Sequence, residues 1–352
     1  MLRSLWIRHE TIPDEHRTPL VPQDAAVLVQ RGVQVSVEAS PPRAFPIEQY
    51  REAGCAVVPP GSWVGAPEDT VIVGLKQLPP DPPALHHRHV YFGHAYKRQA
   101  GSAELLRRFR AGGGELLDLE YLTDEHGRRL AAFGYWAGYI GAALAALHYH
   151  GRLVPPLAPT SRADLDAELA ALPTGGTRAL VLGALGRCGT GARDALATAG
   201  IATTAWDVAE TRDLDRPTLR GHDLLVNAVL TTRPVPPFVT ADDLAAADRR
   251  LRVIADVTCD VASPYHALPI YHQTTSWAEP VLGLAEVSPP CDVIAIDNLP
   301  SLLPREASVQ FSADLLSQLT VLGDPDSAWR RCRQAFVDAC RSLEPELDRT
   351  DA

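Results

Sequence analysis

Short apolar runs alternate with amphipathic segments through the first third of the chain. VQVSVEAS (residues 33–40) and TVIVGLK (residues 70–76) are β-branched and bounded by Pro, Gly or Ser, so they predict β-strands, as does HVYFGHAY (residues 89–96). Residues 23–32 and 47–55 have apolar positions at helical spacing and run into glycine, which predicts helices. Strands that alternate with helices predict a parallel α/β sheet.

Two further stretches extend this organisation. Residues 101–122 predict another helix and strand, so the first unit ends near residue 130. Residues 131–151 are apolar with small residues on one face, but their Gly, Tyr and His content argues against a membrane span. We expect a buried helix between two domains there, followed by a proline-rich connecting segment at residues 153–176.

A second α/β unit begins at residue 177. A strand, a glycine turn, a helix and a strand ending in Asp207 follow one another. Residues 222–230 and 249–260 supply further buried strands, and residues 326–343 predict an amphipathic helix. The sequence therefore predicts an α/β protein of two Rossmann-like domains with parallel sheets and an interdomain cleft.

The glycine turn of the second unit has the features of a nucleotide site. Glycines at 183, 186 and 189 are spaced like the dinucleotide fingerprint, with a first interval one residue wider. Asp207, 18 residues after Gly189, stands where an acid accepts hydrogen bonds from the adenosine ribose. A turn that needs positive φ would also explain the glycines, but the strand, helix and acid around them favour nucleotide binding. The acid would repel a 2′-phosphate, so we predict NAD.

Composition narrows the class of protein. The net charge of −10 argues against a nucleic-acid partner or an anionic membrane surface. The first residues lack the apolar run of a signal peptide, and the six cysteines form no C-x-x-C pair. We expect a cytoplasmic, reduced protein without a disulfide framework or a structural metal, acting as a monomer or a simple homo-oligomer.

Lysine is rare in this chain, because Lys76 and Lys97 are the only lysines among 33 lysine and arginine residues. An arginine-rich coding bias explains the scarcity. Lysine, unlike arginine, can lose its proton when buried, so Lys76 at the end of a strand is a candidate general base, although a lysine reaching solvent is an equal alternative. His94 alone would suggest a core histidine. The HHRH stretch (residues 86–89) resembles a metal cluster, but we expect it on a solvated turn.

Seven stretches together resemble the NAD-dependent, lysine-forming saccharopine dehydrogenases, within the wider alanine dehydrogenase and transhydrogenase fold group. They are RHETIPDEHRTPLVP, GLKQLP, YFGHAYKRQAGS, LLDLEYL, GRRLAAFGYWAG, LGALGRCGTGA and NLPSLLPREAS. The resemblance implies oxidation of the secondary amine of saccharopine by NAD, then hydrolysis of the imine to lysine and 2-oxoglutarate. It also implies a discontinuous substrate-side domain (residues 1–130 plus 306–352) around an NAD-binding domain (residues 131–305).

The resemblance also implies roles for residues at matching positions. Lys76 is expected to accept the proton of the amine, and His94 to activate water and shuttle protons. Expected substrate contacts are Arg17, Lys97, Gln99, Glu120, Arg129, Phe133, Thr258, Cys259 and Asp260. Expected cofactor contacts are Arg128, Gly183, Gly186, Arg187, Asp207, Thr211, Leu230, Val257, Ile296, Asp297, Asn298 and Leu299. Saccharopine has three carboxylates, so an acidic protein needs fixed cations to bind it, such as Arg17, Lys97 and Arg129.

Four residues depart from the family pattern. Gln77 stands where a glutamate is usual, which should favour the neutral form of the neighbouring lysine. Asn298 replaces a histidine, Leu230 a tyrosine, and Ala228 a cysteine that could pair with Cys188. The departures leave open the same chemistry on another amine and 2-oxo acid, as in opine formation. A non-catalytic NAD-binding regulator is a further alternative, against which the retained lysine–histidine pair argues.

Overall fold

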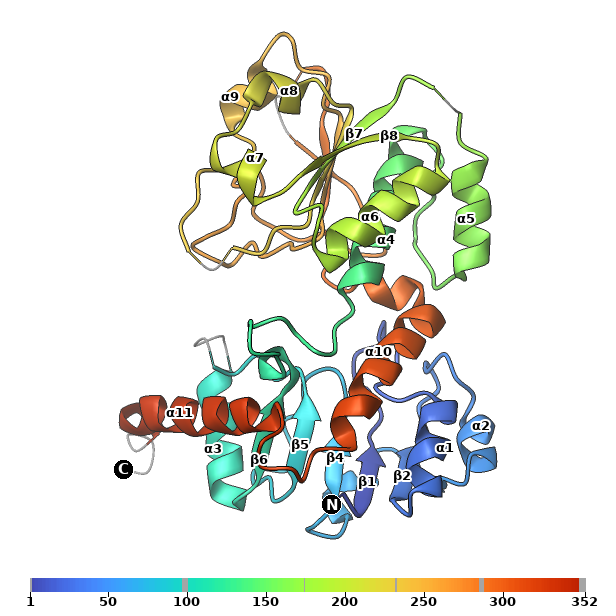
Figure 1. Ribbon diagram of the computed structural model, residues 1–352, viewed down its shortest axis with the longest axis vertical. Coiled ribbons are helices and arrows are strands. Elements are labelled where there is room, and N and C mark those ends of the chain that lie inside the picture. The colour runs from blue at the N-terminus through green and yellow to red at the C-terminus, as the bar shows by residue number, and fades with distance from the viewer. Residues whose placement is uncertain (1, 97–100, 174, 232, 285–287, 348–352) are drawn as a thin grey trace. The chain divides into compact units, whose positions relative to one another are not determined.

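The chain divides into two compact units, which Figure 1 shows as ribbons. The computed structural model describes residues 2–96, 101–173, 175–231, 233–284 and 288–347. Of these, residues 343–347 are described as backbone only. Unit 1 comprises Met1–Ala132 and Ala307–Ala352, and unit 2 comprises Phe133–Glu306. The assignment of substrate to one unit and cofactor to the other stays a prediction.

Unit 1 contains a six-stranded parallel sheet with the order β3-β2-β1-β4-β5-β6. Its strands are β1 (Ser4–Ile7), β2 (Gln34–Glu38), β3 (Ala56–Val58), β4 (Val71–Val73), β5 (Arg88–Tyr91) and β6 (Glu115–Asp118). The direction in which strands are added reverses between β1 and β4. In open α/β sheets, ligands bind outside the carboxyl ends of strands at such a switch point.

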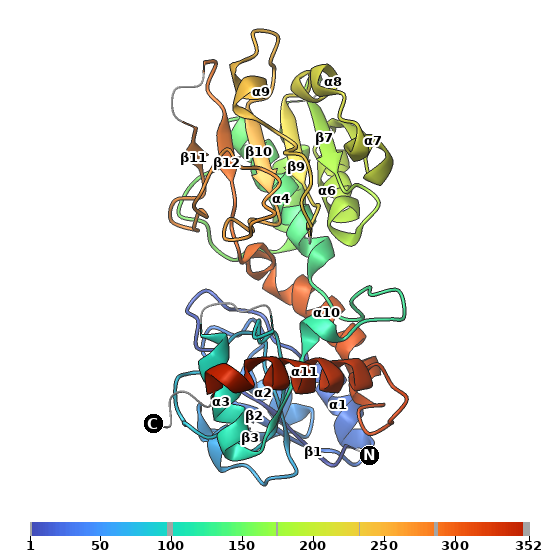
Figure 2. The ribbon, with the colours of Figure 1, turned by 90° about the vertical axis from the view of Figure 1, so that its left-hand side faces the viewer.

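Helices of unit 1 contact strands near both ends of the sheet, β2 and β3 at one end and β6 at the other. They are α1 (Pro22–Gln30), α2 (Ile47–Glu52), α3 (Ser102–Gly112), α10 (Pro304–Leu319), α11 (Trp329–Leu347) and the 3₁₀ turns η1 (Ser62–Gly65) and η2 (Leu119–Tyr121). Contacts join α1 to β2 and α2 to β3, whereas α11 contacts both β6 and α3 (Figures 1 and 2). The chain passes from unit 2 back into unit 1 within α10.

The HHRH stretch corrects one expectation. His86 is exposed, but His87 and His89 are 3% and 0% exposed, so a solvated turn is wrong for these two. His89 lies on β5, and its ring packs edge-on against Trp63 and Phe109 in the core. Burial, helped by the charges of neighbouring groups, lowers the pKa of His89 well below its usual value. His87 and His89 are therefore buried in unit 1, whereas His86 and Arg88 of the same stretch are exposed.

Unit 2 contains a second six-stranded sheet, with the order β11-β12-β10-β9-β7-β8 (Figure 2). Its parallel strands are β7 (Arg178–Leu182), β8 (Ala202–Trp206), β9 (Leu224–Asn227), β10 (Val253–Asp256) and β12 (Asp292–Ile294). The predicted α/β class and parallel sheets are confirmed, except that β11 (Leu282–Gly283) is antiparallel to β12. Residues 284–291 are too few for the crossover that a parallel connection requires.

The helices of unit 2 include one unusually close pair. They are α4 (Gly134–Tyr149), α5 (Arg162–Ala170), α6 (Arg187–Thr198), α7 (Val208–Arg212), α8 (Arg216–Arg220), α9 (Ala241–Ala245) and the 3₁₀ turn η3 (Leu299–Leu302). A Cβ atom on Gly138 of α4 would lie 1.8 Å from the carbonyl oxygen of Cys188, and one on Gly191 of α6 would lie 1.9 Å from that of Tyr135. Glycine therefore lets α4 and α6 pack backbone to backbone, which fixes the start of α6.

The apolar helix α4 is buried along most of its length, as expected from its sequence. Its contacts with α6, β9 and β10 lie within unit 2. Within the described ranges, the length and hydropathy that a bilayer crossing demands do not occur together in any helix. The segment expected as a plain connection contains α5, which Ser161 caps by accepting the backbone N–H of Asp164.

Candidate functional site

The two residues expected to transfer protons, and an acid expected on the substrate side, lie at the carboxyl ends of three neighbouring strands in unit 1. Lys76 follows β4, His94 follows β5 and Glu120 follows β6. Because β4, β5 and β6 are adjacent and parallel, their carboxyl ends meet at one edge of the sheet. The topology thus brings together three side chains that are far apart in the sequence.

Two buried charged residues hold the backbone of Lys76. The carboxylate of Glu10 accepts the N–H groups of Leu75 and Lys76 at 2.7 and 3.0 Å, and Arg8 donates to the carbonyl of Lys76. Arg8 and Glu10 also form an ion pair at 3.4 Å, and their side chains are 1% and 4% exposed. A Cβ on Gly74 would lie 2.3 Å from Nε of Arg8, so only glycine admits the guanidinium there. The sequence analysis did not identify Arg8 or Glu10. The sign that could have pointed to them is the presence of two charged residues just after the apolar strand SLWI.

His94 is paired with an acid that it shares with an arginine. Its Nδ1 lies 3.5 Å from Oε1 of Glu120, and Nη2 of Arg129 lies 3.8 Å from the same oxygen. The backbone of His94 has φ +49°, a left-handed conformation that turns this residue after β5. The hydrogen bond to Glu120 raises the pKa of His94, while burial and the charge of Lys76 oppose that rise. The predicted residues His94, Glu120 and Arg129 are therefore in contact, and Lys76 is close enough for its charge to act on His94.

Arg17, expected to bind a substrate carboxylate, already has an acid beside it. Its Nε and Nη2 donate to the two carboxylate oxygens of Glu15 at 2.7 and 2.5 Å. Both side chains are almost fully buried, at 5% and 0% exposure. Burial would raise the pKa of Glu15, but the charge and hydrogen bonds of Arg17, together with the charge of Lys76, hold it below the usual value. Sequence reasoning missed Glu15, which balances one of the expected fixed cations.

The remaining predictions for the first unit are placed as follows. Lys97 and Gln99 lie outside the described residues. Arg128 lies on an exposed turn, where its Nε pairs with Asp124 at 2.8 Å. Phe133 is the residue before α4 and opens unit 2.

In unit 2 the glycine turn follows β7 and leads into α6. Gly183 has φ +74°, and a Cβ on Gly189 would lie 2.2 Å from the carbonyl oxygen of Gly183. Gly186 is the residue before α6 and Arg187 is its first residue. The turn therefore brings backbone N–H groups and a helix N-terminus to one place, as a pyrophosphate requires.

Asp207 ties the second strand of this unit to the glycine turn. It follows β8, and its Oδ2 accepts the N–H of Leu185 at 3.0 Å while Oδ1 accepts that of Val208 at 2.9 Å. The hydroxyl of Thr211 donates to the carbonyl of Asp207 at 2.8 Å. The acid is thus held at the glycine turn, and one of its partners, Thr211, was itself predicted to contact the cofactor.

Three large apolar side chains stay exposed at this same edge. Leu185, Val208 and Leu230 follow β7, β8 and β9, and they are 76%, 66% and 51% exposed. The fold does not bury them, which fits an edge covered by the flat rings of a dinucleotide. This exposure, with the glycine turn and the acid, is the evidence that the residues present suit NAD.

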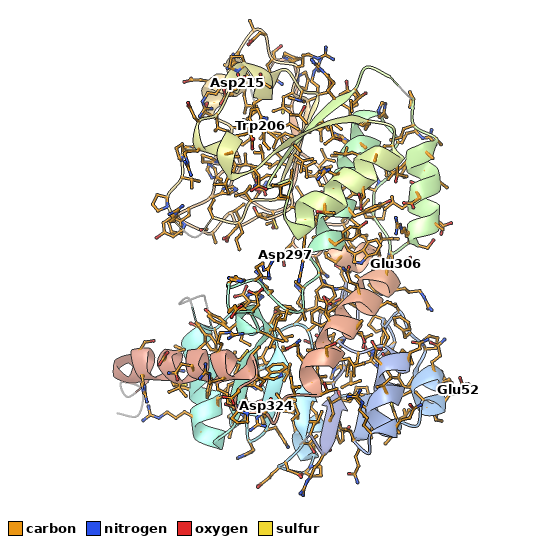
Figure 3. All side chains as sticks on the ribbon, in the orientation of Figure 1. Glu52, Trp206, Asp215, Asp297, Glu306 and Asp324 are labelled. Atoms are coloured by element: carbon orange, nitrogen blue, oxygen red, sulfur yellow. The ribbon has the colours of Figure 1, made fainter. Side chains whose placement is uncertain are left out.

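The other predicted contacts of unit 2 follow β10 and β12. They are Val257, Thr258, Cys259 and Asp260 after β10, and Ile296, Asp297, Asn298 and Leu299 after β12 (Asp297 is labelled in Figure 3). The hydroxyl of Thr258 donates to the buried carboxylate of Asp256 at 2.7 Å, which fixes that loop. No disulfide joins any of the six cysteines, all of which lie in the described ranges.

Comparisons with known proteins agree with this arrangement. The chain matches the model of the alanine dehydrogenase/PNT N-terminal domain over residues 6–140. The saccharopine dehydrogenase (NAD(+), L-lysine-forming) of Neurospora crassa is 42% identical over 360 residues, covering 96% of this chain and 97% of that protein. The enzyme of the same name from Schizosaccharomyces pombe is 41% identical, covering 96% and 99%.

Solved structures with a similar fold are more distant in sequence. An L-alanine dehydrogenase superposes with a TM-score of 0.68 at 18% identity, covering 98% of this chain and 99% of that one. A transhydrogenase from Sinorhizobium meliloti gives a TM-score of 0.66 at 16% identity, covering 91% and 94%. These likenesses show the fold.

Proposed function

The chain belongs to the family of NAD-dependent, lysine-forming saccharopine dehydrogenases, and we propose on this basis that it interconverts saccharopine with L-lysine and 2-oxoglutarate. It is an oxidoreductase that acts on a CH–NH bond with NAD. The observation that supports the proposal most is the meeting of Lys76, His94 and Glu120 at one sheet edge. A protein that only binds NAD has no need of an acid–base set there.

In this proposal Lys76 accepts the proton of the secondary amine of saccharopine, for which it must be neutral. The acid whose charge acts on Lys76 is Glu15, and Arg17 balances that charge through two hydrogen bonds. The Arg17–Glu15 pair therefore places a pair of opposite, hydrogen-bonded charges near Lys76. Glu10 and Arg8 hold the lysine backbone, so the base is positioned before the substrate arrives.

His94 carries the second half of the reaction. It removes a proton from water as the water adds to the imine carbon. It then returns that proton to the nitrogen, and as the C–N bond of the carbinolamine breaks it accepts the proton of the hydroxyl group, which yields the amine of lysine and the carbonyl of 2-oxoglutarate. Glu120 stabilises the protonated ring between these steps, and Arg129, which lies beside Glu120, offers a cation to a substrate carboxylate.

The second unit holds the cofactor in this proposal. Bound NAD supplies the acceptor for the hydride that leaves the saccharopine carbon. Asp207 orients the ribose, the glycine turn and the start of α6 receive the pyrophosphate, and Leu185, Val208 and Leu230 cover the rings. We also propose that the enzyme works in the reducing cytoplasm, which fits a chain whose described residues form no disulfide.

The amine substrate is the part of the proposal that needs a direct test. Purified protein is assayed for NADH and NADPH oxidation with 2-oxoglutarate and a panel of lysine, ornithine, arginine and other amines. We expect turnover with lysine and NADH. If lysine gives none while another amine does, the chain performs opine-like chemistry, for which the departures at Gln77 and Leu230 already give a motive.

Two variants make the assay specific. Lys76→Met should remove turnover and leave NADH binding, measured by fluorescence, unchanged. Gln77→Glu restores the acid that the family usually has beside Lys76. It should shift the pH–rate profile to higher pH without changing the preferred amine. Wild-type protein that binds NADH but turns over no amine in the panel would favour a regulator instead.

A further inference from the structure

Asp118 sets the position of Glu120. It is the last residue of β6, it opposes Tyr91 of β5 in the sheet register, and it is 0% exposed. Its Oδ1 accepts the backbone N–H of Glu120 at 3.0 Å and so caps the 3₁₀ turn η2. The turn that presents Glu120 to His94 therefore begins on the Asp118 carboxylate.

A negative charge at this position needs an explanation, because a neutral amide would serve equally as a cap. Oδ2 of Asp118 has no hydrogen bond of ordinary geometry in the part of the chain that the structure describes, although the backbone N–H of Gly93 points to the carboxylate and favours its charged form. Burial of a charge without a compensating partner disfavours the charged form. Burial, reinforced by the nearby charge of Glu120, raises the pKa of Asp118 to about 6, while the backbone N–H groups of Glu120 and Gly93 and the charge of His94 limit the rise.

The groups that face Asp118 come from three elements and the loops next to them. Tyr91 lies on β5, and Gly93, His94 and Tyr96 follow it. Glu120 and Tyr121 belong to η2, and Cys332 belongs to α11, as do Arg331 and Arg333 beside it. Burial, with the charge of Asp118 adding to it, raises the pKa of Cys332 to about 12, so this thiol stays neutral. The two arginines donate to the carbonyls of Thr123 and Leu322. Among the groups with the largest effect on the pKa of Asp118, His94 is the one that carries a positive charge.

We propose that Asp118 is a positioning residue for proton transfer, whose buried carboxylate fixes the backbone of Glu120 and, together with the Glu120 carboxylate, stabilises the positive charge of the His94 imidazolium. Glu120 acts by contact, at 3.5 Å from Nδ1. Asp118 is 0% exposed whereas the His94 side chain is 51% exposed, so the charge of Asp118 acts on the ring from the buried side of the site. The hydrogen bond to Glu120 raises the pKa of His94 most, the charge of Asp118 adds to that rise, and burial and Lys76 oppose it. This inference rests on the proposed function, in which His94 is the acid–base residue.

Asp118→Asn tests the charge separately from the cap, because the amide oxygen still accepts the N–H of Glu120. The matched control is Glu115→Gln, which removes one charge from the first residue of the same strand, about 10 Å away. Glu115 pairs with Arg88 at 2.8 Å and takes no part in the site. Histidine-ring NMR spectra, assigned with His94→Asn, then report the pKa of His94 in each protein.

We expect the His94 pKa to fall by about 0.5–1 unit in Asp118→Asn and to change by less than about 0.2 unit in Glu115→Gln. The limb of the pH–rate profile that reports His94 should shift by the same amount. A merely structural cap would leave both readouts where they are, and an unchanged His94 pKa in Asp118→Asn would overturn the proposal.

A measurement on the unsubstituted side chain covers the case in which Asp118→Asn does not fold. With aspartate carboxyls labelled with ¹³C, one signal should titrate near pH 6 and move to higher pH in His94→Asn, since the two groups titrate together. The absence of any aspartate that titrates between about pH 5 and pH 7 would also overturn the proposal. These spectra need no substrate, so a failure of lysine as substrate is distinguishable from a failure of this inference.

Discussion

Glu10, which follows β1, accepts the backbone N–H of Lys76, which follows β4, at 3.0 Å. The two strands are neighbours at the switch point of the sheet, although the residues are 66 positions apart. The candidate base is thus fixed by an acid from the other side of the switch point. The position of Lys76 is thus fixed through its backbone, and its side chain is not needed for this.

Replacing Glu10 tests this anchor. Glu10→Ala removes the acceptor for two N–H groups and leaves the buried Arg8 without its acid, so we expect kcat to fall about 10²-fold and stability to fall by about 3 kcal/mol. Glu10→Gln keeps one acceptor oxygen and should retain more of both. Steady-state kinetics and urea unfolding provide the measurements. A normal kcat in Glu10→Ala would show that Lys76 is positioned without it.

Glu38 should dominate the acid stability of unit 1. Its buried carboxylate accepts the N–H groups of His9, Gly61 and Trp63 and the ring N–H of Trp6, at 2.8–3.0 Å. Burial would raise its pKa, but the backbone N–H and the ring of His9, with the backbone N–H groups of Gly61 and Trp63, hold the pKa below the usual value of 4.5. A lowered folded-state pKa means that this contribution is present above pH 4.5 and is lost as the pH falls through the folded value.

Glu38→Gln should therefore cost about 2–4 kcal/mol at pH 7, because it loses the charge-assisted bonds. It should also flatten the fall in stability below about pH 4.5. Urea unfolding at pH 7 and at pH 4 checks both statements. Equal stability of the two proteins at pH 7 would contradict the role given to these bonds.

The contact between α4 and α6 should not tolerate a methyl group. In Gly138→Ala the new Cβ would lie 1.8 Å from the carbonyl oxygen of Cys188, a backbone atom that cannot move without α6. We expect a loss of about 3 kcal/mol and weaker NADH binding, because α6 begins at the glycine turn. Gly65→Ala is the control, since nothing lies within 4 Å of its Cβ and its stability should change by less than about 0.5 kcal/mol.

Asp207 should decide between the two nicotinamide cofactors. Asp207→Ser keeps a side-chain acceptor before α7 but removes the charge that repels a 2′-phosphate. We expect KM for NADH to rise about tenfold and the preference for NADH over NADPH to shrink by more than that. Asp215→Ser is the matched control, because Asp215 caps α8 in the same way and is labelled in Figure 3 at the end of unit 2 away from Asp297.

Some of this site was predictable from the sequence because its signals are local. The glycines at 183, 186 and 189 and the acid at 207 belong to one strand–turn–helix–strand unit, so their spacing is enough. The resemblance to a family provided Lys76, His94 and Glu120. Their meeting at one edge then follows from parallel neighbouring strands.

Other residues of the site were not predictable, for physical reasons. Glu10 and Asp118 act on backbone N–H groups, and nothing in a sequence shows which N–H an acid will cap. Glu15 neutralises an arginine only two positions away, a pairing that reads as ordinary surface charge until both side chains are seen to be buried. Burial of His89 depends on its strand lying inside the sheet, which a proline-rich neighbourhood conceals.

The half-buried lysine after β4 also gives this chain an unusual chemical handle. With only two lysines in the sequence, a reagent that modifies primary amines has few targets besides Lys76 and Lys97, which both lie on the expected substrate side. Reductive methylation would therefore act almost as an active-site titrant, and saccharopine should protect against it. For the same reason, coupling this protein to a support through its amines would consume the group that the reaction needs, whereas its free cysteines or carboxylates offer a safer attachment.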